Sequence, residues 1–394
     1  MKITTTLNLP SAFRLGFIGL FSFGAFSQVI AQTVPKHDHV IICMMENYDY
    51  SEIIGDVTDC PYINGLTTDP YGALFTNYFA IEHPSQPNYL DIFSGNNQGN
   101  TSDVTPTNYP YTVANLGAEL IAKSYTFGGY SESLTSVGSQ ASTAGGTNGY
   151  ARKHAPWTNW LGTGTNQIPS TVHMPFTSFP TSANYSTLPT VSFVVPNLGD
   201  DMHNGTAPTN KQAGDLWVKT NLDAYIQWAK TNNSLFIIVW DEDDNTGGSN
   251  QVNMTFVGQN VKAGNYSEKA THYRLLRTLE DMYGLGYAGG SSTEVPITDC
   301  WKSIATGISA VGNPENFVRV VPNPFTSLTV IKSANELRNA ELKIFDALGR
   351  EVESIKEING FQITVNRNNL GSGLYYFSIL QDQTQVSRGK LVVE

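Results

Sequence analysis

Three stretches of the chain are mostly apolar, and each ends abruptly in polar residues. They cover residues 40–45, 190–196 and 235–240. Runs of this kind are typical of strands that are buried on both faces of a parallel sheet. A fourth run, residues 252–257, ends at Gly258 and is a further candidate strand.

Helical patterns lie between and after these runs. Residues 116–123 and 215–230 have apolar positions at helical spacing, and residues 272–283 show the clearest pattern, with Gly284 as the stop. Apolar strands that alternate with amphipathic helices predict an α/β domain with a mostly parallel central sheet.

The polar residues after the three runs predict a binding site. In open parallel sheets, ligands bind beyond the carboxyl ends of the strands. A single Asp after a strand is usually a turn residue or a helix cap, but three acidic strand ends at one edge need a cation to offset their repulsion. The residues concerned are Glu46 and Asn47; Asn197, Asp200, Asp201 and His203; and Asp241 to Asp244.

Residues 81–95 resemble a loop that leaves a strand and enters a short helix. Pro87 suits the first helical position and Gly95 suits the stop. Ser85 then lies at the helix N-terminus, where free backbone N–H groups and the helix dipole favour an anion. Ser85 is therefore either an N-cap or a nucleophile.

Residues 96–189 are rich in Gly, Ser, Thr, Asn and Pro, and we expect long loops that cover the active edge. The segment 150–157 is unusually basic and aromatic for this chain. Either it is a surface turn with a packed Trp, or Lys153 or His154 holds an anionic substrate.

The composition changes after Trp301. Residues 302–318 are expected to be a linker, and residues 319–394 contain short strand patterns separated by turn signals. The expected strands are 328–332, 341–345, 362–365, 374–380 and 390–393. This spacing predicts a small antiparallel β-sandwich after the larger α/β domain of residues 33–301.

Composition indicates an exported protein. Residues 1–32 read as a secretory signal peptide, and no later stretch is long and apolar enough to span a membrane. With a net charge of −11, the chain lacks the basic footprint of a nucleic-acid-binding protein. Cys43 fits a buried strand, whereas Cys60 and Cys300 either form a disulfide or remain unpaired thiols.

An ordered series of motifs resembles the bacterial phosphoesterase family of acid phosphatases and phospholipases C, within the alkaline phosphatase superfamily. The series covers roughly residues 36–301 and implies an α/β/α sandwich. The motifs are residues 39–49, the segment His83-Pro-Ser-Gln-Pro-Asn88, residues 195–197 with 201–203, residues 240–242, and His272 at the start of its helix.

The resemblance implies a metal site and a nucleophile. Ser85 stands in the place of the family's Ser or Thr nucleophile. The implied metal ligands are Glu46, Asn47, Asp241 and Glu242. Relatives with two zinc ions carry Asp-His where this chain has Asp241-Glu242. We therefore expect one divalent cation on oxygen ligands, which could be Ca, Mg, Mn or Zn.

The resemblance also implies substrate contacts. His203 would hold a phosphoryl oxygen or protonate the leaving group, and His272 would do likewise or bind the metal. Asn88 would contact the phosphate. Each histidine also has a structural alternative, as a loop residue for His203 and as a hydrogen-bonded helix residue for His272.

The C-terminal region resembles the type A sorting domain of the type IX secretion system of Bacteroidetes. The resemblance is carried by residues 321–325, 342–350, 370–376 and 389–393. It implies that the type IX machinery is a partner and that the protein is secreted or held at the cell surface.

Together these expectations describe a secreted, metal-dependent phosphoesterase. The leading hypothesis is an acid phosphatase that hydrolyses phosphate monoesters through a phosphoserine on Ser85. A phosphodiesterase or phospholipase C using the same site is one alternative. A non-catalytic surface binding protein on the same fold is another.

Overall fold

The computed structural model describes residues 34–302 and 318–394, except residues 247, 369 and 383. The expected signal peptide, residues 1–32, lies outside the described residues, as do residues 303–317 of the expected linker. Contacts divide the chain into two compact units, Met1–Lys302 and Ser303–Glu394.

The first unit is built on an eight-stranded sheet with the order β11-β2-β10-β9-β1-β8-β4-β7. Of these strands only β10 runs antiparallel to its neighbours, as the pairings of the described residues show. The strands are β1 (His39–Met45), β2 (Gly72–Phe75), β4 (Phe127–Ser131), β7 (His173–Pro175), β8 (Val191–Val195), β9 (Ser234–Trp240), β10 (Met254–Gly258) and β11 (Gly264–Tyr266).

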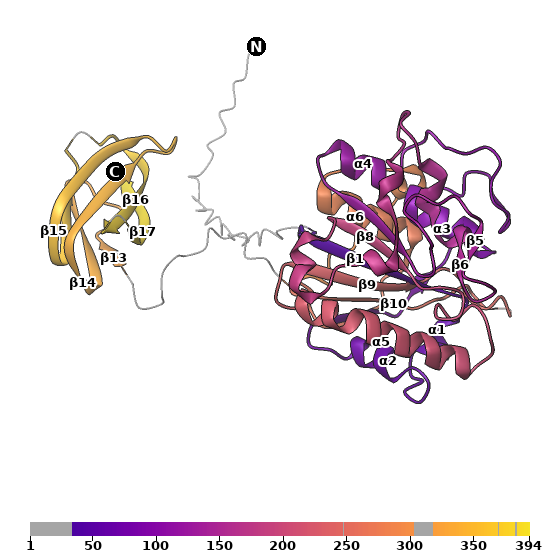
Figure 1. The fold of residues 1–394 in the computed structure, drawn as a ribbon. Helices are drawn as coiled ribbons and strands as arrows, with labels where there is room; N and C mark the ends of the chain where they lie inside the picture. Colours follow the sequence, from indigo (N-terminus) through magenta and orange to yellow (C-terminus); the bar gives the residue numbers. More distant parts are fainter. Residues whose placement is uncertain (1–33, 247, 303–317, 369, 383) are drawn as a thin grey trace, which may run out of the picture. The chain divides into compact units, whose positions relative to one another are not determined.

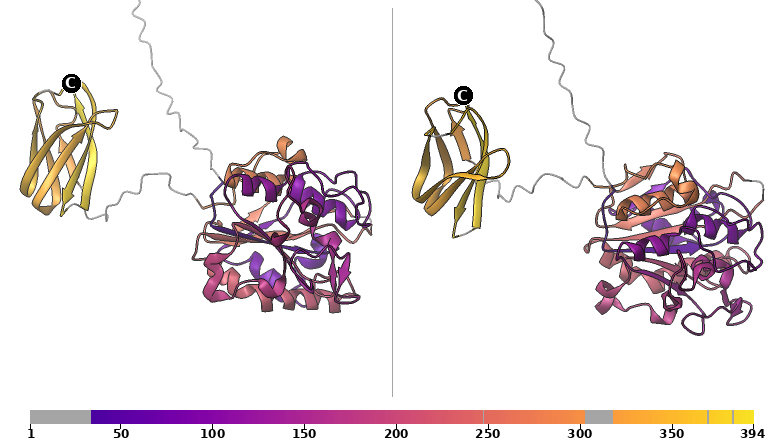
Figure 2. Two further views of the ribbon diagram at one scale, coloured as in Figure 1. Left: turned by 45° about the horizontal axis from the view of Figure 1, so that its top comes forward. Right: turned by 90° about the horizontal axis from the view of Figure 1, so that it is seen from above.

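Helices cover both faces of this sheet (Figures 1 and 2). One face carries α3 (Ser85–Ser94), α4 (Leu116–Ala122) and α6 (His272–Tyr283), and the other carries α2 (Pro61–Thr67) and α5 (Thr209–Ala229). The shorter elements are α1 (Tyr50–Ile53) and the small strands β3 (Tyr78–Phe79), β5 (Thr143–Ala144), β6 (Tyr150–Ala151) and β12 (Ala270–Thr271). The predicted α/β/α sandwich with a mostly parallel sheet is confirmed.

The apolar runs became central strands because both of their faces are covered. Every residue of β9 is buried, and β1 is buried after its first residue. The predicted helix 272–283 has the bounds of α6, and Gly284 ends it in the left-handed region at φ 62°. This match reflects a strongly amphipathic sequence followed by a residue that adopts positive φ without strain.

Two parts of the first unit differ from the prediction. Residues 96–189 are not only loops, since β4 and β7 lie within them and extend the central sheet. Helix α5 begins at Thr209 rather than at residue 215. Its first turns hold Asn210 and Lys211, polar residues that are buried by specific contacts with Tyr48 and Asp56 and therefore hide the helical pattern.

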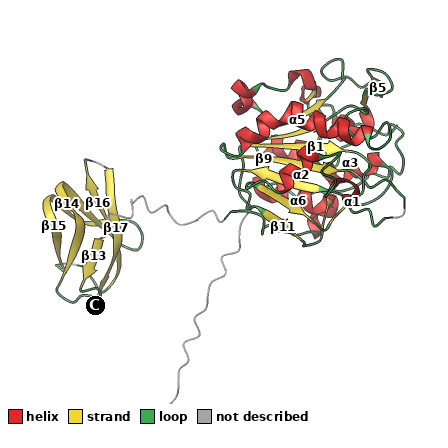
Figure 3. Ribbon diagram, turned by 90° about the horizontal axis from the view of Figure 1, so that it is seen from below, coloured by secondary structure: helices red, strands yellow, loops and turns green. Residues whose placement is uncertain are grey.

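In the second unit, all regular secondary structure among the described residues is β-strand (Figure 3). It is an antiparallel sheet ordered β13-β14-β16-β17, with β15 also paired to β14. Strand β14 is one long, irregular strand where the sequence predicted two, and its register shifts let it bend. The strands are β13 (Val318–Val321), β14 (Leu328–Phe345), β15 (Glu351–Asn366), β16 (Gly373–Gln381) and β17 (Thr384–Val393).

Cys43, Cys60 and Cys300 are all buried, unpaired thiols, so the disulfide alternative is wrong for this structure. Among the described residues, none of the helices combines the length and the hydropathy that a membrane span requires.

Candidate active site

The carboxyl ends of β9, β1 and β8 meet because these three strands are adjacent and parallel. Their loops are tied together by backbone hydrogen bonds. The Asp241 N–H donates to the Met45 carbonyl at 3.1 Å, and the Glu46 N–H donates to the Asp201 carbonyl at 2.9 Å. The side chains of Glu46, Asp201 and Asp241 are completely buried at this edge.

Ser85 is directed at this acidic edge. It is the first residue of α3, and its Oγ lies 2.9 Å from Glu46 Oε2 and 3.0 Å from Glu242 Oε1. The N-cap is Pro84, and Ser85 follows it inside the helix. The interpretation of Ser85 as an N-cap is therefore wrong. Pro87 is the third helical residue rather than the first, whereas Gly95 ends the helix at φ 66° as expected.

Asn88 fixes the loop that precedes Ser85. Its Oδ1 accepts hydrogen bonds from the N–H groups of Ile81 and Glu82 at 3.0 and 3.1 Å. Its Nδ2 donates to the Glu82 carbonyl at 2.6 Å. With its amide engaged by backbone, Asn88 holds the loop in place, and the expected phosphate contact is not supported.

The buried carboxyl groups repel one another. Burial raises the pKa of Glu46, and burial together with the charge of Glu46 raises the pKa of Asp201 and Asp241. The pKa of Glu242 rises to about 7, because it is buried and because Glu46 is close. Such a cluster is stable when its charge is offset by protons or by a cation.

Buried oxygen atoms without donors support a cation. Asn47 Oδ1, Asp201 Oδ2 and Asp241 Oδ2 have no hydrogen-bond partner within the part of the chain that the structure describes. The Asn47 backbone is held next to Asp241 by a 3.2 Å hydrogen bond to Oδ1. These oxygens are the donor type that hard divalent cations prefer, so the site fits the expected metal.

His154 lies inside the site and not at its opening. Its Nε2 is 3.1 Å from Glu46 Oε1 and its Nδ1 is 3.2 Å from Asp201 Oδ2. The Glu46 contact is too poorly aligned to count as a hydrogen bond. Burial lowers the pKa of His154 well below its usual range. Since only 1% of the residue is exposed, a direct substrate contact is not supported.

A second set of possible metal-binding side chains includes two histidines and differs from the predicted set. Glu46, His154 and His203 each offer one ligand atom, and these atoms lie within 4.8 Å of one another. The group shares only Glu46 with the predicted ligand set. Because imidazole suits zinc and similar metals, it leaves the metal's identity open.

Lys153 and His203 lie side by side near the surface. Lys153 Nζ is 3.2 Å from His203 Nε2 and 2.8 Å from Asp103 Oδ2. Burial acts to lower the Lys153 pKa, but the negative charges of Glu46 and Asp103 outweigh it and raise the pKa. His203 is held in turn by a 2.8 Å hydrogen bond from its backbone N–H to Asp201 Oδ1. The predicted substrate residues Lys153 and His203 are thus brought together.

His272 is a buried support of the site. One ring nitrogen is 2.7 Å from the Asp241 carbonyl oxygen, and the other is 2.7 Å from the Tyr78 hydroxyl. Burial lowers its pKa to about 4. With both nitrogens engaged and the residue fully buried, the predicted contact with substrate or metal is not supported. His272 instead positions the Asp241 backbone.

Two further side chains support the carboxylates. His83 Nδ1 contacts Glu242 Oε2, and its Nε2 is 3.3 Å from Asp243 Oδ1. Tyr89 donates a 2.5 Å hydrogen bond to Glu46 Oε1 and stacks on His154 with ring centroids 5.0 Å apart. Sequence reasoning missed Tyr89, although it lies four residues after Ser85 and so on the same helix face.

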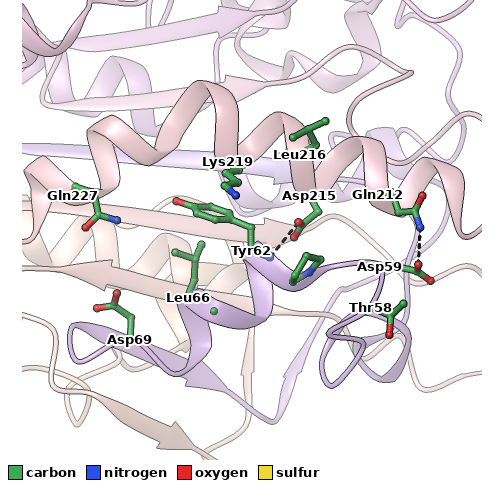
Figure 4. A pocket seen from close by; sticks show the side chains of 12 residues that line it. Thr58, Asp59, Tyr62, Leu66, Asp69, Gln212, Asp215, Leu216, Lys219 and Gln227 are labelled. Atoms are coloured by element: carbon green, nitrogen blue, oxygen red, sulfur yellow. Dashed lines mark hydrogen bonds between the residues drawn. The ribbon is translucent and has the colours of Figure 1, made fainter.

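A separate hollow of about 560 Å³ lies between α2 and α5 (Figure 4). Tyr62 and Leu66 from α2 and Asp215 and Lys219 from α5 line it. None of the residues around Ser85 contributes to it. The hollow is therefore distinct from the candidate active site.

Two family models match the chain. The phosphoesterase family matches residues 68–286, and the secretion system C-terminal sorting domain matches residues 319–394. A phosphatidylinositol-3-phosphatase of Mycobacterium tuberculosis is 44% identical over 280 residues, covering 71% of this chain and 88% of that protein.

More distant relatives are fungal. A phosphate-repressible acid phosphatase of Penicillium chrysogenum is 29% identical over 225 residues, covering 55% of this chain. An acid phosphatase of Aspergillus fumigatus is 26% identical over 254 residues, covering 62% of this chain. The chain spans 53% and 54% of these two proteins. A Vibrio parahaemolyticus structure from the alkaline phosphatase superfamily is 10% identical, with a TM-score of 0.46 and 78% of both chains covered.

Proposed function

Because the chain belongs to the phosphoesterase family and is an enzyme of phosphate-ester hydrolysis, we propose that it is a metal-dependent phosphomonoesterase of the acid phosphatase type. Its sorting domain indicates export to the cell surface or secretion. We further propose that residues 33–301 form the catalytic domain, that residues 302–318 link it to the sorting domain, and that the type IX machinery recognises residues 319–394.

One observation carries the proposal: the Ser85 hydroxyl lies between two carboxylates at the N-terminus of a helix. Its Oγ is within 3.0 Å of oxygens from both Glu46 and Glu242. A carboxylate at that distance accepts the hydroxyl proton as the oxygen attacks phosphorus. Glu46 and Glu242 are both candidate acceptors, because burial raises the pKa of each carboxyl group. His83 holds the other oxygen of Glu242.

The cation would be held by Glu46, Asn47, Asp241 and Glu242, with His154 and His203 as further donors. When bound, it would lower the pKa of the Ser85 hydroxyl and offset charge on the phosphoryl oxygens. The positive end of the α3 dipole adds a favourable interaction with the same anion.

The reaction has two chemical stages. Ser85 Oγ attacks phosphorus, the ester oxygen leaves, and a phosphoserine forms; water then attacks the phosphoserine and releases inorganic phosphate. Lys153 Nζ offers positive charge to the phosphoryl oxygens. The Lys153 ammonium donates to His203 Nε2 at 3.2 Å, so this ring nitrogen carries no proton and His203 orients the ammonium beside the phosphoryl group. The leaving oxygen takes its proton from water.

The relatives favour monoesters over the phospholipase C alternative, since the curated proteins reported above bear the names of phosphatases. A second candidate substrate is a phosphorylated inositol lipid. It is favoured by the 44% identity to a phosphatidylinositol-3-phosphatase.

The test compares the purified protein with Ser85→Ala and with Ser94→Ala. Ser94 is a matched control, because it lies on the same helix, is buried, and its Oγ is hydrogen-bonded to the carbonyls of Leu90 and Asn96 and to the Gln98 side chain. The substrates are an aryl phosphate monoester, a bis-ester, phosphatidylcholine and phosphatidylinositol 3-phosphate, with and without a chelator.

We expect monoester hydrolysis that the chelator abolishes, a loss of about 10³-fold or more in kcat for Ser85→Ala, and near-normal activity for Ser94→Ala. Equal activity of the wild-type and Ser85→Ala proteins would exclude the proposed nucleophile. Faster cleavage of the bis-ester or of phosphatidylcholine than of monoesters would overturn the phosphomonoesterase assignment.

A further inference from the structure

A loop carboxylate occupies two hydrogen-bond donors next to the nucleophile. Asp103 Oδ1 accepts a 3.0 Å hydrogen bond from the backbone N–H of Gln86, the residue after Ser85. Its Oδ2 accepts a 2.8 Å hydrogen bond from Lys153 Nζ. Asp103 therefore bridges the N-terminus of α3 and the Lys153 ammonium group, which lies beside His203.

The Gln86 side chain holds the same loop. Its Nε2 donates to the carbonyls of Ser102 and Val104, both at 2.8 Å. These two residues flank Asp103, so one buried glutamine fixes the loop on both sides of the carboxylate. The loop itself is exposed from Thr101 to Val104, and 71% of Val104 is accessible to solvent.

The occupied donors are those that a phosphoryl group needs. A phosphate monoester binds to backbone N–H groups at a helix N-terminus and to ammonium groups. The Gln86 N–H and Lys153 Nζ supply one of each, beside Ser85 and His203. Asp103 presents two carboxylate oxygens to this pair, as two oxygens of a phosphoryl group would.

We propose that Asp103 is an internal stand-in for the phosphoryl group, and that the 101–104 loop moves away when a phosphate monoester binds. The inference rests on the proposed function, since it concerns the phosphoryl subsite beside Ser85. A phosphate dianion and Asp103 cannot share the two donors, because like charges at such separations repel strongly. Binding of substrate therefore includes the displacement of Asp103, which lowers the apparent affinity.

The alternative is that Asp103 only orients Lys153. The two roles predict opposite effects of removing the carboxylate. An orienting residue strengthens substrate binding, so its loss raises KM. A competing residue weakens substrate binding, so its loss lowers KM and tightens the binding of inorganic phosphate.

The experiment uses the full-length protein loaded with its activating cation, together with Asp103→Asn, Asp103→Ala and the control Asp59→Asn. Asp59 is another loop aspartate with a side-chain partner, Gln212, but it lies at the α2–α5 hollow, away from Ser85. Inorganic phosphate binding is measured by calorimetry, and KM and kcat are measured with an aryl phosphate. Thermal unfolding checks that each variant is folded.

For both Asp103 variants we expect a fall of about two- to fivefold in the phosphate Kd and in KM, the size expected for a partly exposed ion pair. We expect kcat to be maintained and Asp59→Asn to match the wild type. An unchanged or weaker phosphate affinity in folded Asp103 variants would overturn the inference. If no protein hydrolyses any ester but the Asp103 variants still bind phosphate more tightly, the proposed function fails while the stand-in role is supported.

Discussion

Asp91→Asn should change how the stability of the catalytic unit depends on pH. Asp91 lies on α3 and is completely buried. Its Oδ1 accepts a 3.0 Å hydrogen bond from the Tyr273 hydroxyl, whereas Oδ2 has no donor among the described residues. Burial, with a smaller contribution from the charge of Glu82, raises the pKa of Asp91 to about 8 from its usual 3.8.

Because the pKa of Asp91 is raised in the folded protein, the free energy of unfolding falls as the pH rises. The folded protein holds a proton on Asp91 that the unfolded chain releases near pH 4, so the group's contribution to stability is complete below pH 4. That contribution is lost as the pH rises through the window from about 4 to about 8. A pKa difference of about four units corresponds to a ceiling of roughly 6 kcal/mol at ~1.4 kcal/mol for each unit. Relaxation and water penetration reduce the effect, and we expect about 2–4 kcal/mol.

Asparagine reproduces the protonated acid at every pH, because its carbonyl can accept from Tyr273 and its amide cannot lose a proton. Asp91→Asn should therefore equal the wild type near pH 4 and be more stable by about 2–4 kcal/mol at pH 8 to 9. At ~2–3 °C per kcal/mol, this is a difference of roughly 4–12 °C in Tm.

Tryptophan fluorescence is a suitable assay, since all six tryptophans precede residue 302 and report on the catalytic unit. Tm is measured from pH 4 to pH 9 for the wild type, Asp91→Asn and Tyr273→Phe. Tyr273→Phe removes a hydrogen bond that lowers the Asp91 pKa, so its stability loss should extend to higher pH. Parallel Tm profiles for the wild type and Asp91→Asn would show that Asp91 does not have a raised pKa in the folded protein.

Two further substitutions test the supports of the site. Tyr89→Phe removes the 2.5 Å hydrogen bond to buried Glu46, so we expect a loss of about 1.5–3 kcal/mol in urea unfolding and of about 10-fold or more in affinity for the activating cation. An unchanged cation titration would show that Tyr89 does not hold Glu46 for the metal. His272→Ala leaves the Tyr78 hydroxyl and the Asp241 carbonyl without their partner, so Tm should fall, with a cost of about 3–5 kcal/mol. Because the Asp241 backbone loses its support, the folded variant should need more of the activating cation, and excess cation should restore most of its activity. Normal stability with activity lost would instead place His272 at the substrate.

Several central elements, and the sheet edge that carries the candidate site, could be predicted from the amino-acid sequence. The apolar runs of β1, β8 and β9 are legible because strands buried on both faces admit little else, and α6 is legible because its apolar stripe ends at Gly284. The acidic residues after these strands had to meet, because neighbouring parallel strands end at the same edge.

Which side chains line the candidate active site depends on the tertiary structure. His154 and His272 are both buried, and their roles depend on the surfaces that pack on them rather than on their neighbours in sequence. The strands β4 and β7, hidden in a polar stretch, are stabilised by pairing along the edge of the sheet beyond β8. Asp103 lies 17 residues from Gln86 and 50 from Lys153, and no local pattern encodes such contacts. They arise when the packed core fixes where each loop lies, which periodicity along the chain does not specify.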